Sequence, residues 1–579
     1  MPTLDWIGKN KVINHHQAVP FRVLERKYSF DENGQHEEDN GSENMIIKGD
    51  NLEALKALLP RYEGRIKCIY IDPPYNTGFE GWVYNDNVND PKIKKWLGKV
   101  VGKEGEDLSR HDKWLCMMYP RLKLLRRLLS QDGVFFVSIG DDELTNLLYL
   151  VNEIFGRINA IFVWKSRSKP TNAGNAKYRP QKVAEYVIMF TQDENKIFNV
   201  GQREDDYSYP YTDKNGSYRI STILTSNLGS YKRETMRFEV AGYTPPADKR
   251  WKAGYVTIKN LLDNNRLLFT KDGTPMEKIY DYDNESVITP LYTLIDPKIS
   301  GSAESGKTTL NKIIGMGHGF DTVKPNGLIE YLIGICTNKN DIVLDSFAGT
   351  GTTAHAVLNI NKADGGNRKF ILVEMMDYAE SITATRLKEV INGYKADQEN
   401  ILYNKEITIA NLANGVDMLN EANAIVAAAK ERFSSVRKPK IENGHLIVTA
   451  ITKAADQIAG TGGNFSYYEL GEPLLVGDCL NTAVPTEKIR EYIWFMETKT
   501  PFIPSTGDNQ YYLGQHNDTG YYFYYEPQQI TVLDYAFLAT IKEKTSETVI
   551  YADRCSIGED KLAQMNITFK KIPRDISKL

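Results

Sequence analysis

A buried apolar run that ends in Asp-Pro-Pro-Tyr constrains this chain more than any other feature. The run Ile66–Ile71 is short and rich in β-branched and aromatic residues, as buried parallel strands are. Pro73 and Pro74 fix φ and lack a backbone N–H, so the strand cannot continue past Asp72. The following turn therefore leaves the sheet at the strand's carboxyl end, where open α/β sheets bind ligands. Its carboxylate, free carbonyls and tyrosine ring suit an amine on a flat ring.

The composition bounds the class of protein. At 579 residues the chain is long enough for three or four domains, and Lys plus Arg (71) against Asp plus Glu (75) gives a net charge of −4. Because the chain is not uniformly basic, any DNA contact must come from a local patch. The five cysteines are far apart and form no CxxC pair, which argues against zinc knuckles and a disulfide framework. We expect a soluble protein of the reducing cytoplasm with no membrane contact, since neither a signal core nor a membrane-length apolar segment occurs.

Strands and helices alternate up to about residue 165, which predicts a parallel α/β sheet. Residues 1–43 end in a polar, acidic run that is interpreted as a loop. Residues 45–60 then predict a strand, a turn and a helix, with Asp50 and Glu53 as a capping box. A helical stripe in 111–133 begins or kinks at Pro120. The rhythm breaks between about 166 and 318, which predicts an inserted domain. It returns in 319–395, and the region after 396 is mixed, with an antiparallel pattern in its last third.

A second apolar strand, which begins at Ile342, runs into a glycine loop. Gly349 and Gly351 let a backbone approach a ligand closely, and the helix start that follows favours an anionic group. Glu374 ends the next predicted strand, 25 residues after Gly349, where an acid can hold two ribose hydroxyls. The loop fits a dinucleotide, because it satisfies GxGxxA, or an adenosine-containing cofactor such as S-adenosylmethionine.

The two strand ends together favour methyl transfer to an amine over hydride transfer. A nicotinamide-dependent oxidoreductase has no need of Asp-Pro-Pro-Tyr, whereas an enzyme that methylates the exocyclic amine of a base does. The lone pair of that amine is delocalised into the ring, and acceptors at Asp72 and the Pro73 carbonyl would turn it toward the methyl sulfonium. Tyr75 would stack on the base after it is flipped from the duplex. The displacement is in line, so positioning supplies most of the acceleration.

The chain resembles the amino-methyltransferases of the β class, in which Asp-Pro-Pro-Tyr precedes the target-recognition domain and Phe-x-Gly-x-Gly follows it. The matching residues are 72–75 and 347–351, and FDTVKP (320–325) lies where the family has another cofactor-binding motif. Within this class the chain is most similar to modification (Mod) subunits of type III restriction–modification systems. That likeness rests on GDNLEALKALLP, IDPPYNTGFEGWVYNDN, LSRHDKWLCMMYPRL and FKKIP. It covers residues 1 to about 395, and the rest matches in position and general character.

The resemblance implies an α/β fold: a Rossmann-like S-adenosylmethionine-dependent methyltransferase domain of the seven-stranded type, with an inserted target-recognition domain and a C-terminal α+β domain. The implied domains are an N-terminal arm (1–43), a catalytic half (44–165), the target-recognition domain (166–318), a cofactor-binding half (319–395) and a C-terminal domain for dimer or restriction-subunit contacts (396–579). The implied function is methylation of adenine N6 at a specific site in double-stranded DNA. A homodimer and a separate restriction (helicase–nuclease) subunit are the implied partners. Methylation of cytosine N4 and a catalytically idle specificity subunit are the alternatives.

The same resemblance assigns roles to single residues. The catalytic residues would be Asp72, Pro73, Pro74 and Tyr75. The cofactor-binding residues would be Asp345, Phe347, Gly349, Gly351 and Glu374, with Lys324 and Pro325 nearby. Asp50 would contact the target base or the cofactor, or it is an ordinary helix N-cap. Asp141 and Asp142 are interpreted as the start of a helix rather than as site residues.

Other patterns carry less weight. Residues 301–308, GSAESGKT, match the Walker A pattern, but no clear apolar strand directly precedes them, so we do not predict an ATP site. The histidines show no ligand spacing, and we predict no metal. The absence of a Pro-Cys dipeptide argues against a cytosine C5 methyltransferase. The tyrosine-rich hairpin at 511–525 is more typical of a sheet core or an oligomer contact than of a base-stacking platform.

DNA contact is expected from one basic segment. Residues 165–182 hold six basic residues and no acid. These residues are Lys165, Arg167, Lys169, Lys177, Arg179 and Lys182. A solvated loop is the alternative, but the position of the segment at the join of the catalytic and inserted domains favours contact with phosphates.

Overall fold

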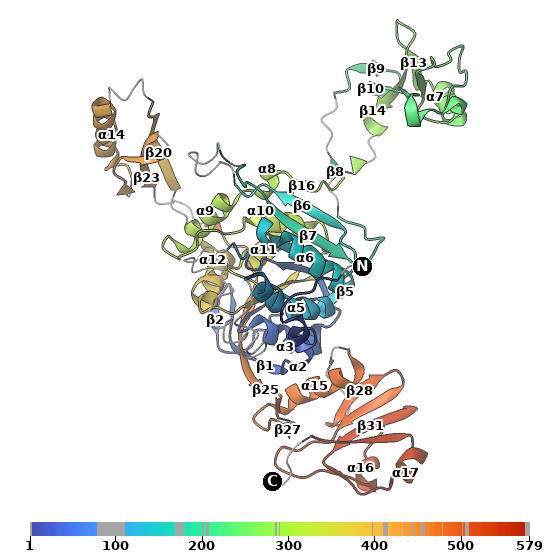
Figure 1. Cartoon of the computed structure of the whole chain (residues 1–579), viewed down its shortest axis with the longest axis vertical. Coiled ribbons are helices and arrows are strands. Elements are labelled where there is room, and N and C mark those ends of the chain that lie inside the picture. Colours follow the sequence, from blue (N-terminus) through green and yellow to red (C-terminus); the bar gives the residue numbers. More distant parts are fainter. Residues whose placement is uncertain are drawn as a thin grey trace. The chain divides into compact units, whose positions relative to one another are not determined.

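A computed structural model of the chain (Figure 1) shows two compact units, Met1–Asn199 with Tyr292–Leu579, and Val200–Leu291, each described here by itself. The structure describes residues 3–77, 110–167, 178, 180–199, 202–203, 208–283, 287–288, 290–395, 398–408, 415–433, 435–442, 445–452, 458–477, 479–500, 502–503 and 509–573.

The first unit is built on a mixed sheet that has eleven strands in the described part of the chain, in the order β16-β6-β7-β5-β4-β17-β18-β3-β25-β1-β2. Their bounds are β16 Leu294–Ile295, β6 Ala160–Trp164, β7 Glu185–Thr191, β5 Leu129–Ile139, β4 Ile66–Ile71, β17 Ile342–Asp345, β18 Lys369–Glu374, β3 Met45–Lys48, β25 Phe465–Pro473, β1 Arg22–Asp31 and β2 Gly34–His36. The six consecutive strands from β5 to β25 run parallel to one another, whereas β7, on the other side of β5, is antiparallel to it. The central strands are apolar and buried, as a sheet covered on both faces requires. The prediction of an α/β fold is confirmed.

Helices follow the strands as the alternation predicts. They include α3 Asn51–Tyr62, α5 Arg110–Leu128, α6 Asp141–Ile154, α10 Asn326–Gly334, α11 Thr352–Asp364 and α12 Thr385–Asn392. The apolar faces of α3, α5 and α6 pack with the central strands in one core cluster. Pro120 lies inside α5, which begins at Arg110, so of the two alternatives for this proline the start of a helix is wrong. Leu129, which lies within the predicted stripe of 111–133, is the first residue of β5.

Two predicted boundaries are wrong because distant segments enter the same sheet. The predicted arm, 1–43, contributes β1 and β2, and the predicted C-terminal domain, 396–579, contributes β25. β25 lies between β3, to which it is parallel, and β1, to which it is antiparallel. The sheet is therefore wider than the seven-stranded type. Alternation of side chains along a strand identifies its buried face but not the strand it pairs with, so the sequence pattern could not reveal this insertion.

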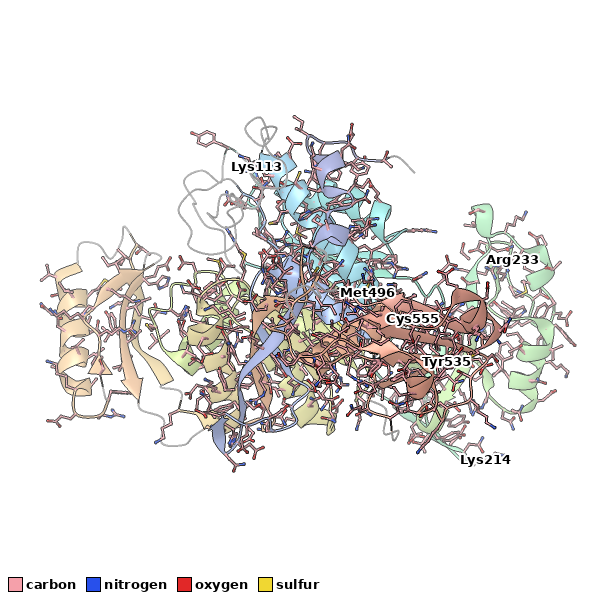
Figure 2. All side chains as sticks on the ribbon, turned by 90° about the horizontal axis from the view of Figure 1, so that it is seen from below. Lys113, Lys214, Arg233, Met496, Tyr535 and Cys555 are labelled. Atoms are coloured by element: carbon pink, nitrogen blue, oxygen red, sulfur yellow. The ribbon has the colours of Figure 1, made fainter. Side chains whose placement is uncertain are left out.

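The inserted unit, Val200–Leu291, is smaller than the predicted domain 166–318. The flanking described residues belong to the main sheet, because β7 pairs with β5 and β16 pairs with β6. The inserted unit has its own sheet of β13 Leu267–Phe269, β14 Pro275–Tyr280, β10 Gly216–Thr222 and β9 Tyr211–Asp213, together with helix α7 Tyr255–Asp263. A small core centred on fully buried Trp251 and Ile258 holds it together. Lys214 and Arg233, labelled in Figure 2, are exposed on this unit.

The region after residue 396 contains two further small structures besides β25. In the first, β20 Gln398–Glu406 pairs with β23 His445–Thr452, and α14 Gly415–Ala429 packs on β23. The second has helix α15 Thr486–Thr498 and the sheet β28 Tyr512–His516, β29 Thr519–Phe523, β31 Glu547–Ala552 and β33 Ile567–Lys571. Only the first pair of this sheet is antiparallel, as predicted; the others are parallel. Tyr512, Tyr521, Tyr522 and Tyr525 are buried, which confirms the sheet-core interpretation of the hairpin.

None of the helices that the structure describes is long and apolar enough to cross a bilayer.

The insertion of β25 generates a stability prediction. Phe465 is fully buried and stacks on Phe30 of β1, with ring centroids 5.6 Å apart. Phe465→Ala should therefore destabilise the main sheet by about 3–5 kcal/mol. The loss should appear as a lower thermal midpoint and as faster hydrogen exchange of the β3 amides. Ile458→Ala, at an exposed position on the approach to β25, is the matched control and should change neither. Unchanged exchange in β3 after Phe465→Ala would contradict the assignment of β25 to the main sheet.

Candidate functional site

The two strand ends singled out in the sequence are neighbours. β4 and β17 pair in parallel, with Cys68 opposite Val343 and Ile69 opposite Leu344. The Asp72–Tyr75 turn and the glycine loop therefore leave the sheet at the same edge, which confirms the expectation that they share one sheet.

The turn after β4 is held by hydrogen bonds to its main chain. The indole N–H of Trp114 donates to the Pro74 carbonyl over 2.7 Å, and Trp114 is fully buried in α5. Asn76 has a left-handed backbone (φ 54°), a conformation that asparagine tolerates better than most residues. Its amide donates to buried Glu143 of α6, and its carbonyl accepts from Arg110 over 2.9 Å. The turn is thus fixed by two helices and is a rigid part of the site.

The side chain of Lys324, a residue that precedes α10, contacts this turn. Its ammonium is 2.9 Å from Oδ2 of Asp72 and 3.3 Å from Oε2 of Glu185, and it lies 4.9 Å from the centroid of the Tyr75 ring. The other Asp72 oxygen, Oδ1, is buried and has no hydrogen-bond partner among the described residues. Burial raises the pKa of Asp72, and the Lys324 charge opposes that shift. Burial disfavours the Lys324 ammonium as well, but the two carboxylates raise its pKa overall.

The placement of Lys324 differs from the predicted one. We expected this residue beside the predicted cofactor loop, whereas its ammonium contacts Asp72 in the turn after β4. Its main-chain carbonyl does lie at the loop, since it accepts from the Thr352 hydroxyl over 3.4 Å at the start of α11. Pro325 is the N-cap residue of α10. The segment therefore contacts both halves of the site.

Glu185 is a site residue that the sequence did not reveal. It is the first residue of β7, and its Oε2 accepts from the Tyr75 hydroxyl over 2.8 Å. Because β7 is antiparallel to β5, its amino end lies at the edge where the parallel strands have their carboxyl ends. The sequence does show an acid at the start of an apolar strand. This acid indicates a site residue only once the direction of β7 is known. Tyr75 also packs on Gly140, where an added Cβ would lie 3.0 Å from the ring.

The glycine loop depends on Glu374. Its carboxylate accepts the N–H of Gly349 over 2.9 Å and that of Met376 over 3.0 Å. Gly349 and Gly351 have left-handed backbones (φ 54° and 79°), which favour glycine. Glu374 thus shapes the loop, and because a carboxylate has about four lone-pair sites, a ribose contact remains compatible with this role.

Asp345 ends β17 behind the loop and is buried. It accepts from the Thr353 hydroxyl over 2.5 Å and from the Phe347 N–H over 3.0 Å. Burial raises its pKa from 3.8 to about 7. Phe347 is half-buried against the main core. Arg386, fully buried in α12, donates to the Thr350 carbonyl and to the hydroxyls of Thr350 and Thr352, so the loop is held from both sides.

Asp50 caps α3. Its Oδ1 accepts the N–H of Leu52 over 2.8 Å, and its Oδ2 lies 3.3 Å from buried Arg121. The N-cap alternative is confirmed, and contact with a target base or cofactor stays a prediction. Asp141 begins α6, as expected.

The Walker A string forms a capped helix rather than a phosphate loop. Residues 303–308 lie in α9 Ala303–Ile314, and the Ser302 and Ser305 side chains form a capping box. Lys307 pairs with Asp321 over 2.7 Å. A Cβ at Gly306 would lie 2.2 Å from the Val323 carbonyl, so this glycine allows α9 to pack against the chain just before Lys324.

The basic segment is partly described. Lys165 and Arg167 are exposed, whereas Lys169, Lys177 and Arg179 lie outside the described residues. Lys182 is 3.2 Å from Asp141 and 3.8 Å from Asp142 of α6. The segment contains no acid in sequence, but the fold brings two acids to this lysine.

Comparison with known proteins places the chain in a family. A family model described as DNA methylase matches residues 66–385, from the first residue of β4 to the first residue of α12 and more than half of the chain. The chain belongs to this family of DNA methylases. Its main sheet is therefore the α/β methyltransferase fold that the resemblance implied.

The relatives are longer than the matched region. The chain is 32% identical over 364 residues to the type III restriction-modification enzyme StyLTI Mod subunit of Salmonella typhimurium, covering 58% of this chain and 53% of that protein. It is 28% identical over 437 residues to the EcoP15I Mod subunit of Escherichia coli, covering 64% of each. The match thus spans between about half and two thirds of these curated relatives. A solved PvuII DNA methyltransferase (cytosine-N4-specific) overlaps 60% of this chain and 86% of its own, at 17% identity and a TM-score of 0.33.

The raised pKa of Asp345 generates a pH prediction. Between about pH 4 and 7 the folded protein holds a proton that the unfolded chain releases, so this group's contribution to stability is lost as the pH rises. Asparagine does not titrate. The stability of wild type relative to Asp345→Asn should therefore fall between pH 4 and 8, by about 4 kcal/mol for a shift of this size.

Denaturant unfolding of both proteins across this range measures the effect. Asp377→Asn, at an exposed position, is the control and should follow wild type throughout. A constant difference between Asp345→Asn and wild type would show that Asp345 does not titrate in this window.

Proposed function

We propose that the chain transfers a methyl group from S-adenosylmethionine to the N6 amine of adenine in a specific double-stranded DNA site. The observation that carries this proposal is the Oδ1 atom of Asp72. It is buried, it has no partner among the described residues, and it lies in a turn beside the Tyr75 ring, next to the strand that carries the glycine loop. An acceptor so placed suits an amine on an aromatic ring.

The residues at the glycine loop fit S-adenosylmethionine. Within the described part of the chain, the buried hydroxyl of Ser346 has no hydrogen-bond partner. The N-cap of α11, Gly351, provides no side-chain cap, so the first N–H groups of this helix suit a carboxylate. Asp345, Phe347, Gly349, Gly351 and Glu374 would hold the cofactor, with Pro325 and the main chain of Lys324 beside them. When bound, the cofactor supplies an electrophilic methyl group on a sulfonium.

The catalytic turn orients the amine. Oδ1 of Asp72 accepts an amine N–H, which turns the nitrogen lone pair out of conjugation with the ring. This hydrogen bond tightens as the nitrogen becomes more positive, so it stabilises the transition state more than the bound substrate. The Tyr75 ring stacks on the flipped base, and Pro73 and Pro74 keep the turn rigid. Because burial raises the pKa of Asp72, its carboxylate is also suited to take the proton that the methylated nitrogen releases.

The remaining parts of the proposal concern DNA and partners. The names of the Salmonella and E. coli relatives support the role of Mod subunit in a type III restriction–modification system, and to this role we add site specificity. We assign target recognition to the inserted unit, which exposes Lys214 and Arg233, and phosphate contacts to Lys165 and Arg167. In this role the chain would form a homodimer, act in the cytoplasm, and cleave DNA only together with a separate restriction subunit.

Asp72→Ala tests the catalytic role. The variant should lose methyl transfer at least about 100-fold in kcat, while it keeps cofactor affinity and most DNA affinity, because the lost interaction belongs to the transition state. Methyl incorporation into unmethylated bacterial DNA measures this loss. Asp560→Ala, at an exposed position in helix Glu559–Gln564 outside the site, is the control and should be fully active. Mass spectrometry of the nucleosides identifies the product: N4-methylcytosine in place of N6-methyladenine would keep the mechanism and change the substrate.

Gly351→Val tests the cofactor loop. Gly351 begins α11 with φ 79°, and an added Cβ would lie 3.1 Å from Thr383, so a side chain should distort the loop and abolish S-adenosylmethionine binding. Gly365 at the other end of α11 also has a positive φ (66°), but an added Cβ meets nothing within 4 Å. Gly365→Val therefore carries a similar backbone strain and should bind the cofactor normally. Equal calorimetric affinity of both folded variants would refute the assignment of the loop.

A further inference from the structure

We infer that Lys324 and Glu185 are positioning residues for the proposed reaction. Lys324 occupies one carboxylate oxygen of Asp72 so that the other faces the target amine, and Glu185 fixes both Lys324 and the Tyr75 ring. The inference rests on the proposed function. Both residues act through Asp72 and Tyr75 and do not contact the substrate themselves.

Four side chains from three separate parts of the fold contact one another in a ring, which the turn between Asp72 and Tyr75 closes. Asp72 and Tyr75 follow β4, Glu185 begins β7, and Lys324 precedes α10. The contacts run from Asp72 Oδ2 to Lys324 Nζ (2.9 Å), to Glu185 Oε2 (3.3 Å) and back to the Tyr75 hydroxyl (2.8 Å). The side chains of Lys324 and Glu185 are only 9% and 17% exposed. Charges this buried are stable only when they are paired, so each member holds the next in place.

Neighbouring groups prevent Lys324 from moving elsewhere. Its ammonium lies 5.6 Å from the ring of Trp164, which is fully buried and donates its indole N–H to the Gly301 carbonyl over 3.0 Å. Gly306 lets α9 approach the chain at 323–324 closely, which fixes the main chain next to Lys324. The lysine is therefore confined between two aromatic rings and two carboxylates.

This arrangement has two consequences for Asp72. First, of the two Asp72 carboxylate oxygens, Oδ1 is the one left to accept from the amine. Second, the two flanking charges affect the ionisation of Asp72 in opposite directions: Lys324 lowers its pKa and Glu185 raises it. The other titratable groups that face Asp72 are Tyr75 in the same turn, Tyr70 of β4 and Asp345 of β17. These three groups are the same in wild type and in the variants below. Differences between the pH profiles therefore measure the effects of Lys324 and Glu185.

The test is the pH dependence of kcat for the full-length variants Lys324→Met and Glu185→Gln, with unmethylated bacterial DNA and S-adenosylmethionine. Asp72 acts as a carboxylate, so kcat falls on the acid side of its pKa. Lys324→Met should move this acid limb to higher pH, and Glu185→Gln should move it to lower pH, each by about one pH unit or more. Lys324→Arg keeps the charge and should leave the limb near its wild-type position. The double variant Lys324→Met/Glu185→Gln should fall between the two.

A direct titration of Asp72 accompanies the kinetics. Difference infrared spectra of the carboxyl stretch, taken between each protein and its Asp72→Asn counterpart, follow the protonation of Asp72 without catalysis. Calorimetric cofactor affinity establishes that each variant is folded. Shifts in the same direction, or losses of activity with unshifted profiles and spectra, would overturn the inference. If wild type methylates no DNA at any pH, the proposed function fails, and the opposite infrared shifts still decide whether the two residues position Asp72.

Discussion

The parallel pairing of β4 with β17 is the contact on which the rest of this site depends. Neither strand end is a site alone: one provides a rigid acceptor and a ring, and the other a loop with left-handed glycines and a helix start. Their register brings both to one edge of the sheet although the inserted unit separates them in sequence. The entropy of closing a long loop grows only slowly with its length, so the main sheet can tolerate a separate unit between its halves.

The short segment before α10 couples the two halves of the site. The Lys324 ammonium binds Asp72 and Glu185, and its carbonyl accepts from Thr352 of the cofactor side. Two residues later, Asn326 accepts from Arg386, and the same guanidinium donates to Thr350 in the glycine loop. A displacement at either half is therefore transmitted to the other through one stretch of backbone. One segment thus contacts both the proposed acceptor for the amine and the proposed cofactor loop, although these lie on different strands.

The sequence predicts those features that local chemistry decides. The end of β4 follows from Pro73 and Pro74, the cap of α3 from Asp50, and the glycine loop from the need for positive φ at Gly349 and Gly351. Features that depend on partner choice were missed. β25 joins the main sheet from beyond residue 396, and the direction of β7 brings Glu185 to the site, yet neither is encoded in side-chain alternation. The same limit explains Lys182, whose acidic partners belong to a separate helix.

Buried polar atoms without hydrogen-bond partners are a second, independent indication of the ligand-binding edge. Folded proteins leave few buried polar atoms without partners, and each costs about 1–3 kcal/mol. Within the described residues, Asp72 Oδ1 follows β4 and Ser346 Oγ follows β17, and both atoms lack a hydrogen-bond partner. Lys324 could have been paired with a carboxylate in many ways, but the observed contact fills Oδ2 of Asp72 and leaves Oδ1. A ligand with polar groups at both strand ends would pair both atoms, as the two substrates of the proposed reaction would when they bind side by side.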